Sequence, residues 1–149
     1  NLRNSSYNER YIQLKKAEKE LSVEYLGAIK LKNFKKEKIS DPIIQKRASH
    51  VISENERVLK SIEYMRKKNI RKFGNLMTES HLSYSNDFEA STKDVDLIVE
   101  NSIKAGANGA RLTGGGFGGF TVSLIEENIK DKWLEYMLNI YDISNFFEV

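Results

Sequence analysis

Apolar residues recur every three or four positions along most of this chain, and this pattern predicts a helix-rich protein. The first helix is expected over residues 6–22, beginning near Ser5 or Ser6. A short helix is expected over residues 23–29, followed by a basic loop. The first helix carries its apolar side chains on one face, at Tyr11, Leu14, Ala17 and Leu21.

The clearest helix signal starts at Asp41. Asp41 is a favourable N-cap residue, and Pro42 suits the first helical position. The helix is expected to run to about Lys68. Its apolar face is formed by Ile43, Ile44, Val51, Val58, Ile62 and Met65.

Three further helices are expected over residues 71–83, 93–105 and 127–141, the second of them capped by Ser91 or Thr92. The first has inward positions at Phe73, Leu76, Met77 and Leu82. The second has its apolar positions at Val95, Ile98, Val99 and Ile103. The third has a buried stripe at Ile129, Trp133, Leu134, Met137 and Leu138.

Between the last two helices the pattern changes to strands, expected over residues 108–114 and 120–125, with a final strand over 145–149. Long helices followed by a strand, a loop, a strand, a helix and a strand predict the α+β class. We expect long helices packed on one face of a small, mostly antiparallel sheet.

Composition narrows the class of protein. The chain has 149 residues, enough for one domain, and lacks cysteine, which excludes disulfides and thiolate metal sites. The net charge is +3, and basic and acidic residues are interspersed along the chain. Such a mixed surface is typical of a solvated protein, so we expect no nucleic-acid binding. No apolar run is long enough to span a membrane, and a cytoplasmic location is expected. Both ends read as abrupt, which is typical of a piece of a longer chain.

Glycine is concentrated between the two strands. Five of the nine glycines fall within six residues, at Gly114, Gly115, Gly116, Gly118 and Gly119. Glycine adopts positive φ without strain and allows another group to approach closely. A row of amides in such a loop also suits an anion such as phosphate. The spacing fits neither a Walker A loop nor a Rossmann fingerprint, so a tight hairpin and a ligand loop both stay open.

The stretch "GARLTGGGFGG" resembles the third motif of the GHMP kinases, and most closely that of galactokinases. Three other stretches resemble galactokinases in the same order along the chain: "SSYNER", "RASHVISENERV" and "FGNLMTESHLSYSNDFEAST". The resemblance implies that residues 1–149 form a GHMP kinase C-terminal, ferredoxin-like domain. The family's sugar signature, main phosphate loop, catalytic Asp and Mg²⁺-binding Glu have no counterpart here. Ser6, Tyr11 and Phe120 depart from the residues usual in the family.

This resemblance implies a role for Tyr7, which aligns with the tyrosine that hydrogen-bonds the sugar in galactokinases. It implies that the five clustered glycines support the loop around the nucleotide phosphates. The parent enzyme would phosphorylate galactose at C1, with ATP and Mg²⁺ held largely by the N-terminal half. The chain alone is then expected to hold no catalytic residue, metal or cofactor, to be inactive, and to self-associate through an uncovered interface. Two alternatives remain: a non-catalytic remnant or standalone binding module, and a related kinase such as one for N-acetylgalactosamine.

Four charged or polar residues lie on one face of the helix over residues 42–68, at Arg47, His50, Glu54 and Arg57. One histidine and one carboxylate make an incomplete metal site, so we interpret this face as a solvated or domain-bridging ionic stripe. Four further groups are interpreted as local hydrogen-bonding and capping groups, namely Glu79, His81, Asp87 and Glu89.

Overall fold

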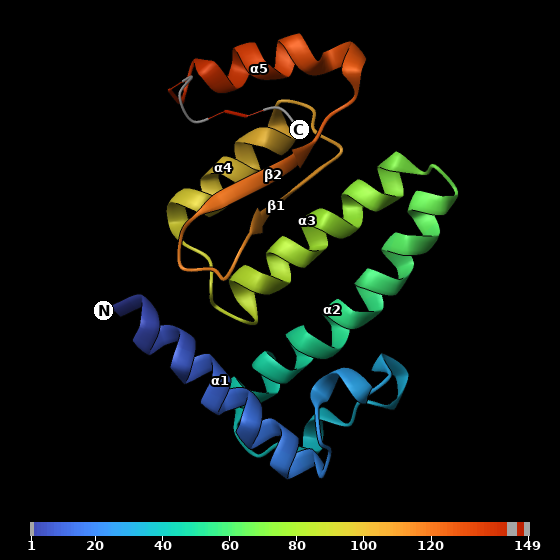
Figure 1. Ribbon diagram of the computed structural model, residues 1–149, viewed down its shortest axis with the longest axis vertical. Coiled ribbons are helices and arrows are strands. Elements are labelled where there is room, and N and C mark those ends of the chain that lie inside the picture. The colour runs from blue at the N-terminus through green and yellow to red at the C-terminus, as the bar shows by residue number, and fades with distance from the viewer. Residues whose placement is uncertain (1, 143–145, 148–149) are drawn as a thin grey trace.

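The computed structural model describes residues 2–142 together with 146 and 147 (Figure 1). Helices α1 and α2 lie at one end of the molecule, α3 lies in the middle, and the sheet with α4 and α5 lies at the other end. The helices are α1 (Leu2–Leu21), α2 (Pro42–Arg66), α3 (Ile70–Asn86), α4 (Lys93–Lys104) and α5 (Lys130–Leu138). Strands β1 (Gly109–Thr113) and β2 (Phe120–Leu124) form an antiparallel pair. The predicted α+β class is confirmed.

Side-chain caps begin α2 and α4 where the sequence predicts them. Asp41 accepts a 2.8 Å hydrogen bond from the amide of Ile43. Thr92, and not Ser91, caps α4 by accepting from the amide of Val95 at 3.3 Å. Asn69 caps α3 in the same way and accepts from Lys72 at 3.0 Å. Each cap satisfies an amide that the first helical turn leaves without a backbone acceptor.

Three segments differ from their predicted form. The short helix expected over residues 23–29 is a single 3₁₀ turn, η1 (Leu26–Ala28), and the basic loop contains two more, η2 (Leu31–Asn33) and η3 (Lys36–Lys38). The last predicted helix is divided into a 3₁₀ turn, η4 (Glu127–Ile129), and α5. Most of the strand expected over 145–149 lies outside the described residues, and residues 146 and 147 are not in a strand.

The sheet register pairs Gly109 with Leu124 and Thr113 with Phe120. Two amides of β1 donate to side chains of α3 at 3.3 Å, Ala110 to Thr78 Oγ1 and Leu112 to His81 Nδ1. Helix α3 therefore supplies acceptors where a further strand would otherwise pair. Helix α4 contacts β2 through Ser102, whose hydroxyl donates to Ser123 Oγ at 2.7 Å.

Two glycines let α3 and β1 touch backbone to backbone. A Cβ added to Gly74 would lie 2.2 Å from the carbonyl oxygen of Asn108. A Cβ added to Gly109 would lie 2.1 Å from the carbonyl oxygen of Gly74. Both positions need glycine for close approach rather than for positive φ.

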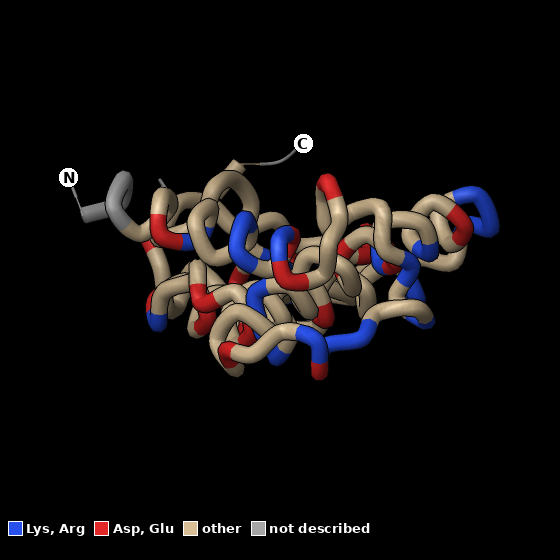
Figure 2. Tube along the Cα trace, turned by 90° about the horizontal axis from the view of Figure 1, so that it is seen from below, with Lys and Arg blue, Asp and Glu red and all other residues tan. Residues whose placement is uncertain are grey.

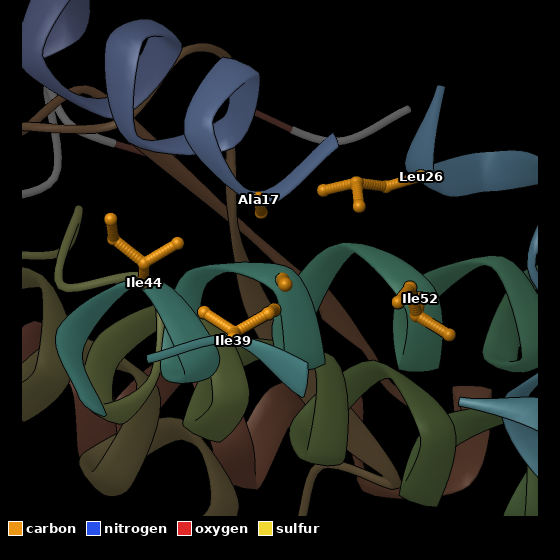
Figure 3. Close-up of a cluster of buried hydrophobic side chains, with 6 residues drawn as sticks. Ala17, Leu26, Ile39, Ile44 and Ile52 are labelled. Atoms are coloured by element: carbon orange, nitrogen blue, oxygen red, sulfur yellow. The ribbon is translucent and has the colours of Figure 1, made fainter. Parts of the chain in front are cut away.

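One apolar core lies between α1, α2 and the 3₁₀ turns, and Figure 3 shows its side chains. A second core joins Ala107 to Trp133 and Met137 of α5. The first core contains Ala17, Leu26, Ile39, Ile44, Ala48 and Ile52.

Several positions predicted to face inward are exposed. On α2, Ile44 is buried, but the expected apolar stripe is uncovered elsewhere, at Ile43, Val58, Ile62 and Met65. Tyr11 on α1 and Leu82 on α3 are also exposed, at 58% and 53%. The helical period was correct, but no described element packs over these parts of the stripe.

Basic and acidic residues are both scattered along the trace when the molecule is seen from below (Figure 2). Among the residues that the structure describes, no helix combines the length and apolar character needed to cross a membrane.

Candidate functional site

The glycine loop, residues 114–119, joins β1 to β2 and uses the left-handed backbone region almost throughout. Positive φ values occur at Gly114, Gly116, Gly118 and Gly119, and also at Phe117. Residues with a side chain avoid this backbone region, so a loop without glycine could not follow the same path without strain. The predicted hairpin is confirmed by the direct pairing of β1 with β2, although its loop of residues 114–119 is longer than a tight turn. A ligand role for the loop stays a prediction.

Gly116 is the most constrained of the clustered glycines. A Cβ at this position would lie 2.6 Å from both the carbonyl oxygen of Ala90 and the hydroxyl of Tyr84. By contrast, a Cβ at Gly114, Gly115 or Gly118 would meet no heavy atom within 4 Å. One side of the loop is therefore packed against the protein, and another side is open.

Tyr7 lies on α1, where its side chain is 61% exposed. One helical turn further on, the guanidinium carbon of Arg10 lies 5.8 Å from the centre of the Phe117 ring in the loop. Tyr84 lies on the packed side of the loop, because a Cβ at Gly116 would lie 2.6 Å from its hydroxyl. Burial raises the pKa of the Tyr84 phenol, and Arg111 opposes that change.

The segment between α3 and α4 borders the same region. We call residues 87–92 the α3–α4 linker. Its Ala90 carbonyl accepts a 2.7 Å hydrogen bond from the amide of Phe117. Two arginines reach the linker from other helices, Arg10 from α1 and Arg47 from α2. Tyr7 and Arg10 are three residues apart, so they share one face of α1.

The predicted ionic stripe on α2 is not solvated. Arg47 and His50 are buried, at 2% and 5% exposure. His50 Nδ1 lies 3.0 Å from the hydroxyl of Ser83, which itself donates to Asp87 at 2.8 Å. Because the Ser83 proton goes to Asp87, Nδ1 of His50 is the donor to Ser83. The stripe bridges elements within this domain, and its prediction as a solvated surface is wrong.

Aromatic packing completes the surroundings of His50. Its ring centre lies 4.9 Å from that of Phe88 and 5.3 Å from that of Tyr84. Burial lowers the pKa of His50 to about 4, so the ring is neutral at neutral pH. His50 is therefore a packed hydrogen-bonding group.

A groove of about 420 Å³ lies on a different part of the surface, between α2, α3 and β2. Glu54 stands at its polar end, bonded to Ser80 at 2.5 Å and paired with Arg57 at 2.8 Å and Arg111 at 3.3 Å. Burial favours a higher pKa for Glu54, but these partners hold it below its ordinary value. The apolar lining includes the exposed stripe Val58, Ile62 and Met65.

The residues interpreted as local hydrogen-bonding and capping groups differ in how deeply they are buried. His81 is buried, accepts from the amide of Leu112, and lies 3.1 Å from Asp96 through Nε2. Asp87 accepts from Ser83, four residues before it, as expected of a local polar group. Glu89 instead accepts from Arg47, 42 residues before it, and is therefore not a local group. Over residues 2–142, 146 and 147, no group of three or more His, Asp or Glu side chains is arranged to hold a metal ion.

Residues 61–139, which include α3, α4, the glycine loop and α5, match the family described as GHMP kinases C terminal. The chain belongs to this family. The match spans both the glycine loop and the α3–α4 linker.

Relatives within the GHMP kinases are galactokinases. The chain is 38% identical to the galactokinases of Fusobacterium nucleatum and of Clostridium acetobutylicum, over 90% of its own length in each case. It spans 36% of the length of each of these enzymes. The crystal structure of Lactococcus lactis galactokinase complexed with galactose superposes on 93% of the chain with a TM-score of 0.86 and 31% identity. The chain covers 37% of that structure. The predicted resemblance is confirmed, and the chain is a galactokinase-like GHMP C-terminal domain.

Sequence reasoning named Tyr7 and the five glycines of this GHMP domain as candidates, and in the structure Arg10, one turn after Tyr7 on α1, contacts the loop at Phe117. It missed Arg10 and the carbonyl of Ala90. Arg10 could have been found from its spacing to Tyr7 on α1. The Ala90 carbonyl could not, because a backbone acceptor leaves no signal in side-chain pattern.

Proposed function

We propose that this chain is the C-terminal domain of an enzyme that transfers the terminal phosphoryl group of ATP to the anomeric hydroxyl of galactose. The supporting observation is the continuous match of the chain to galactokinases, including one solved with galactose. The family match over residues 61–139 contains Tyr84 and the glycine loop.

Tyr7 is proposed to hydrogen-bond the sugar. Its phenol is both donor and acceptor, which suits a hexose hydroxyl. At 61% exposure, the side chain is accessible to a ligand. It also lies one helical turn from Arg10, which contacts the glycine loop at Phe117.

The five clustered glycines are proposed to support the nucleotide phosphates rather than to perform chemistry. The loop is packed at Gly116 and open at Gly114, Gly115 and Gly118. An open face without side chains permits close approach of another backbone loop or of a phosphate. Phosphoryl transfer depends mainly on such positioning and on charge stabilisation.

Mg²⁺ neutralises phosphate charge in phosphoryl transfer when it is bound. The described residues do not offer a matching ligand set, since no suitable cluster of carboxylates or histidines is present among them. We therefore assign no step of the reaction to a metal on this chain. The ligands for Mg²⁺ and the reactive Asp are proposed to come from the part of a galactokinase that this chain does not match.

A chimera tests this proposal. Residues 1–149 replace the matched segment of Clostridium acetobutylicum galactokinase, and we refer to this protein as the chimera. We expect it to phosphorylate galactose with ATP. A folded chimera that does not phosphorylate galactose, beside an active unmodified enzyme, would favour a binding module.

A further inference from the structure

Two buried arginines from two different helices converge on the α3–α4 linker. Arg10 of α1 is 9% exposed and Arg47 of α2 is 2% exposed. Burying a guanidinium is unfavourable unless its donors are satisfied. Three of their acceptors are backbone carbonyls of the linker.

Arg10 holds the linker by two bonds. Its Nε donates to the carbonyl of Phe88 at 2.7 Å, and its Nη2 donates to the carbonyl of Glu89 at 2.9 Å. The guanidinium carbon also lies 5.8 Å from the ring centre of Phe117, at the tip of the glycine loop. Arg10 therefore contacts both the linker and the loop.

Arg47 holds the preceding part of the linker. Its Nη1 donates to the carbonyl of Asp87, and its Nη2 lies 2.7 Å from a carboxylate oxygen of Glu89. Glu89 has a φ of 51°, a left-handed conformation that a glutamate seldom adopts. The ion pair to Arg47 and the Arg10 bond to its carbonyl hold Glu89 in this conformation.

Gln13 joins the two arginines to each other. Its Oε1 accepts from Arg47 Nε at 3.1 Å and from Arg10 Nη1 at 3.4 Å. Burial and the charge of Arg47 lower the pKa of Arg10, while Glu9 and Glu89 oppose this change. The positive charges of Arg10 and Arg47 therefore lie close together because both side chains donate to Gln13.

The linker transmits this constraint to the glycine loop. The residue after Glu89 is Ala90, whose carbonyl oxygen accepts from the amide of Phe117 and lies 2.6 Å from the position of a Gly116 Cβ. In Figure 1 the connection from α3 to α4 runs beside the connection from β1 to β2. Moving Ala90 would therefore remove a support on the packed side of the loop.

We propose that Arg10 and Arg47 are positioning residues that set the conformation of the glycine loop through the α3–α4 linker, and thereby tune nucleotide use. The effect on nucleotide rests on the proposed function. The coupling of the arginines to the loop does not, so the two parts are tested separately.

Amide hydrogen exchange of Phe117, measured by NMR on this chain, tests the coupling. We expect Arg47→Gln and Arg10→Lys each to accelerate exchange at Phe117 by about tenfold, because bonds from charged donors to the linker are lost or misaligned. Ile52→Val is the control, since Ile52 is fully buried in the core between α1 and α2 and does not contact the linker. If Arg47→Gln does not fold, the exchange rate of Phe117 in the milder variant Arg10→Lys still tests the coupling. Exchange at Phe117 that rises no more than in Ile52→Val would overturn the proposal.

Kinetics of the chimera test the consequence for nucleotide. We expect Arg47→Gln to raise the KM for ATP by about threefold to tenfold and to leave the KM for galactose unchanged. A purely structural role would lower kcat through the folded fraction and leave both KM values unchanged. That result would overturn the nucleotide part. An inactive chimera with faster Phe117 exchange in the variants would instead refute the proposed function and keep the coupling.

Discussion

The amide of Phe117 donates a 2.7 Å hydrogen bond to the carbonyl of Ala90 and so fastens the glycine loop to the α3–α4 linker. Gly116 lies next to this bond and has no room for a side chain. The glycines of the loop therefore meet two separate requirements, positive φ and close approach. Gly114 and Gly118 meet only the first, whereas Gly116 meets both.

Substitutions along the loop separate these causes. Gly115→Ala adds a methyl group in open space at a residue without positive φ, and we expect little change in stability. Gly114→Ala adds strain at a φ of 92° and should cost about 1 kcal/mol or more. Gly116→Val adds the same strain and collides with Ala90 and Tyr84, so it should cost a few kcal/mol, about 3 or more. Urea unfolding of this chain measures the series, and equal stabilities for Gly115→Ala and Gly116→Val would contradict the account.

Tyr7→Phe should impair use of galactose more than use of ATP. Loss of a hydrogen bond to a neutral partner costs about 0.5–1.5 kcal/mol, or roughly threefold to tenfold in kcat/KM for the sugar. Steady-state kinetics of the chimera supply the measurement. Tyr11→Phe is the matched control, because Tyr11 is similarly exposed at 58% on the same helix. An unchanged kcat/KM for galactose in Tyr7→Phe would make Tyr7 a surface residue without a sugar contact.

Acidification should destabilise the chain through His50. Its pKa falls from 6.5 to about 4 on folding, chiefly because it is buried. The unfolded chain binds the proton more readily, so the stabilisation is complete above pH 6.5 and is lost as the pH falls towards 4. The fall in pKa corresponds to about 3 kcal/mol. Besides burial, the charged groups that influence His50 are Glu54, Arg57, Asp87 and Arg111.

Unfolding free energies at pH 7, 6 and 5 measure this effect. His50→Gln keeps a hydrogen-bonding side chain near Ser83 and removes the titrating ring, so its stability should depend less on pH. The pKa of His81 is also lowered by burial, and a smaller slope should persist in the variant. An identical slope in His50→Gln and in the unmodified chain would show that His50 does not titrate as described.

The isolated chain should self-associate. Tyr7, Phe120 and Val122 are 61%, 68% and 38% exposed, and they lie on or near the elements that bear the proposed site. Contiguous exposed apolar surface promotes association. Light scattering across a concentration series measures it, and Phe120→Ser should reduce it more than Leu97→Ser on α4. A chain that stays monomeric at high concentration would show that these exposed apolar side chains do not cause association.

The sequence predicted the parts of the fold that local chemistry controls. The Asp41 and Thr92 caps, the two strands and the glycine hairpin follow from residues close together in the chain. It did not predict which part of an apolar stripe is covered, since Ile44 and Met65 have the same helical pattern but different neighbours. The burial of Arg47 likewise depends on a linker 40 residues away.

The region of the candidate site was only partly predictable for the same reason. The family resemblance pointed to Tyr7, and the glycines stood out because they are consecutive or nearly so. The contact between Gly74 and Gly109 and the bond between Phe117 and Ala90 join segments that are distant in sequence. Such contacts become apparent only when the helices are packed.

Formation of galactose 1-phosphate from galactose and ATP by the chimera tests the central claim most directly. The chain of 149 residues alone and the Clostridium enzyme without its matched segment serve as the two comparisons. We predict product from the chimera, and none above background from either part alone. Product from the 149-residue chain alone, or none from a folded chimera, would contradict the claim that this chain is the C-terminal domain of a galactose-phosphorylating enzyme.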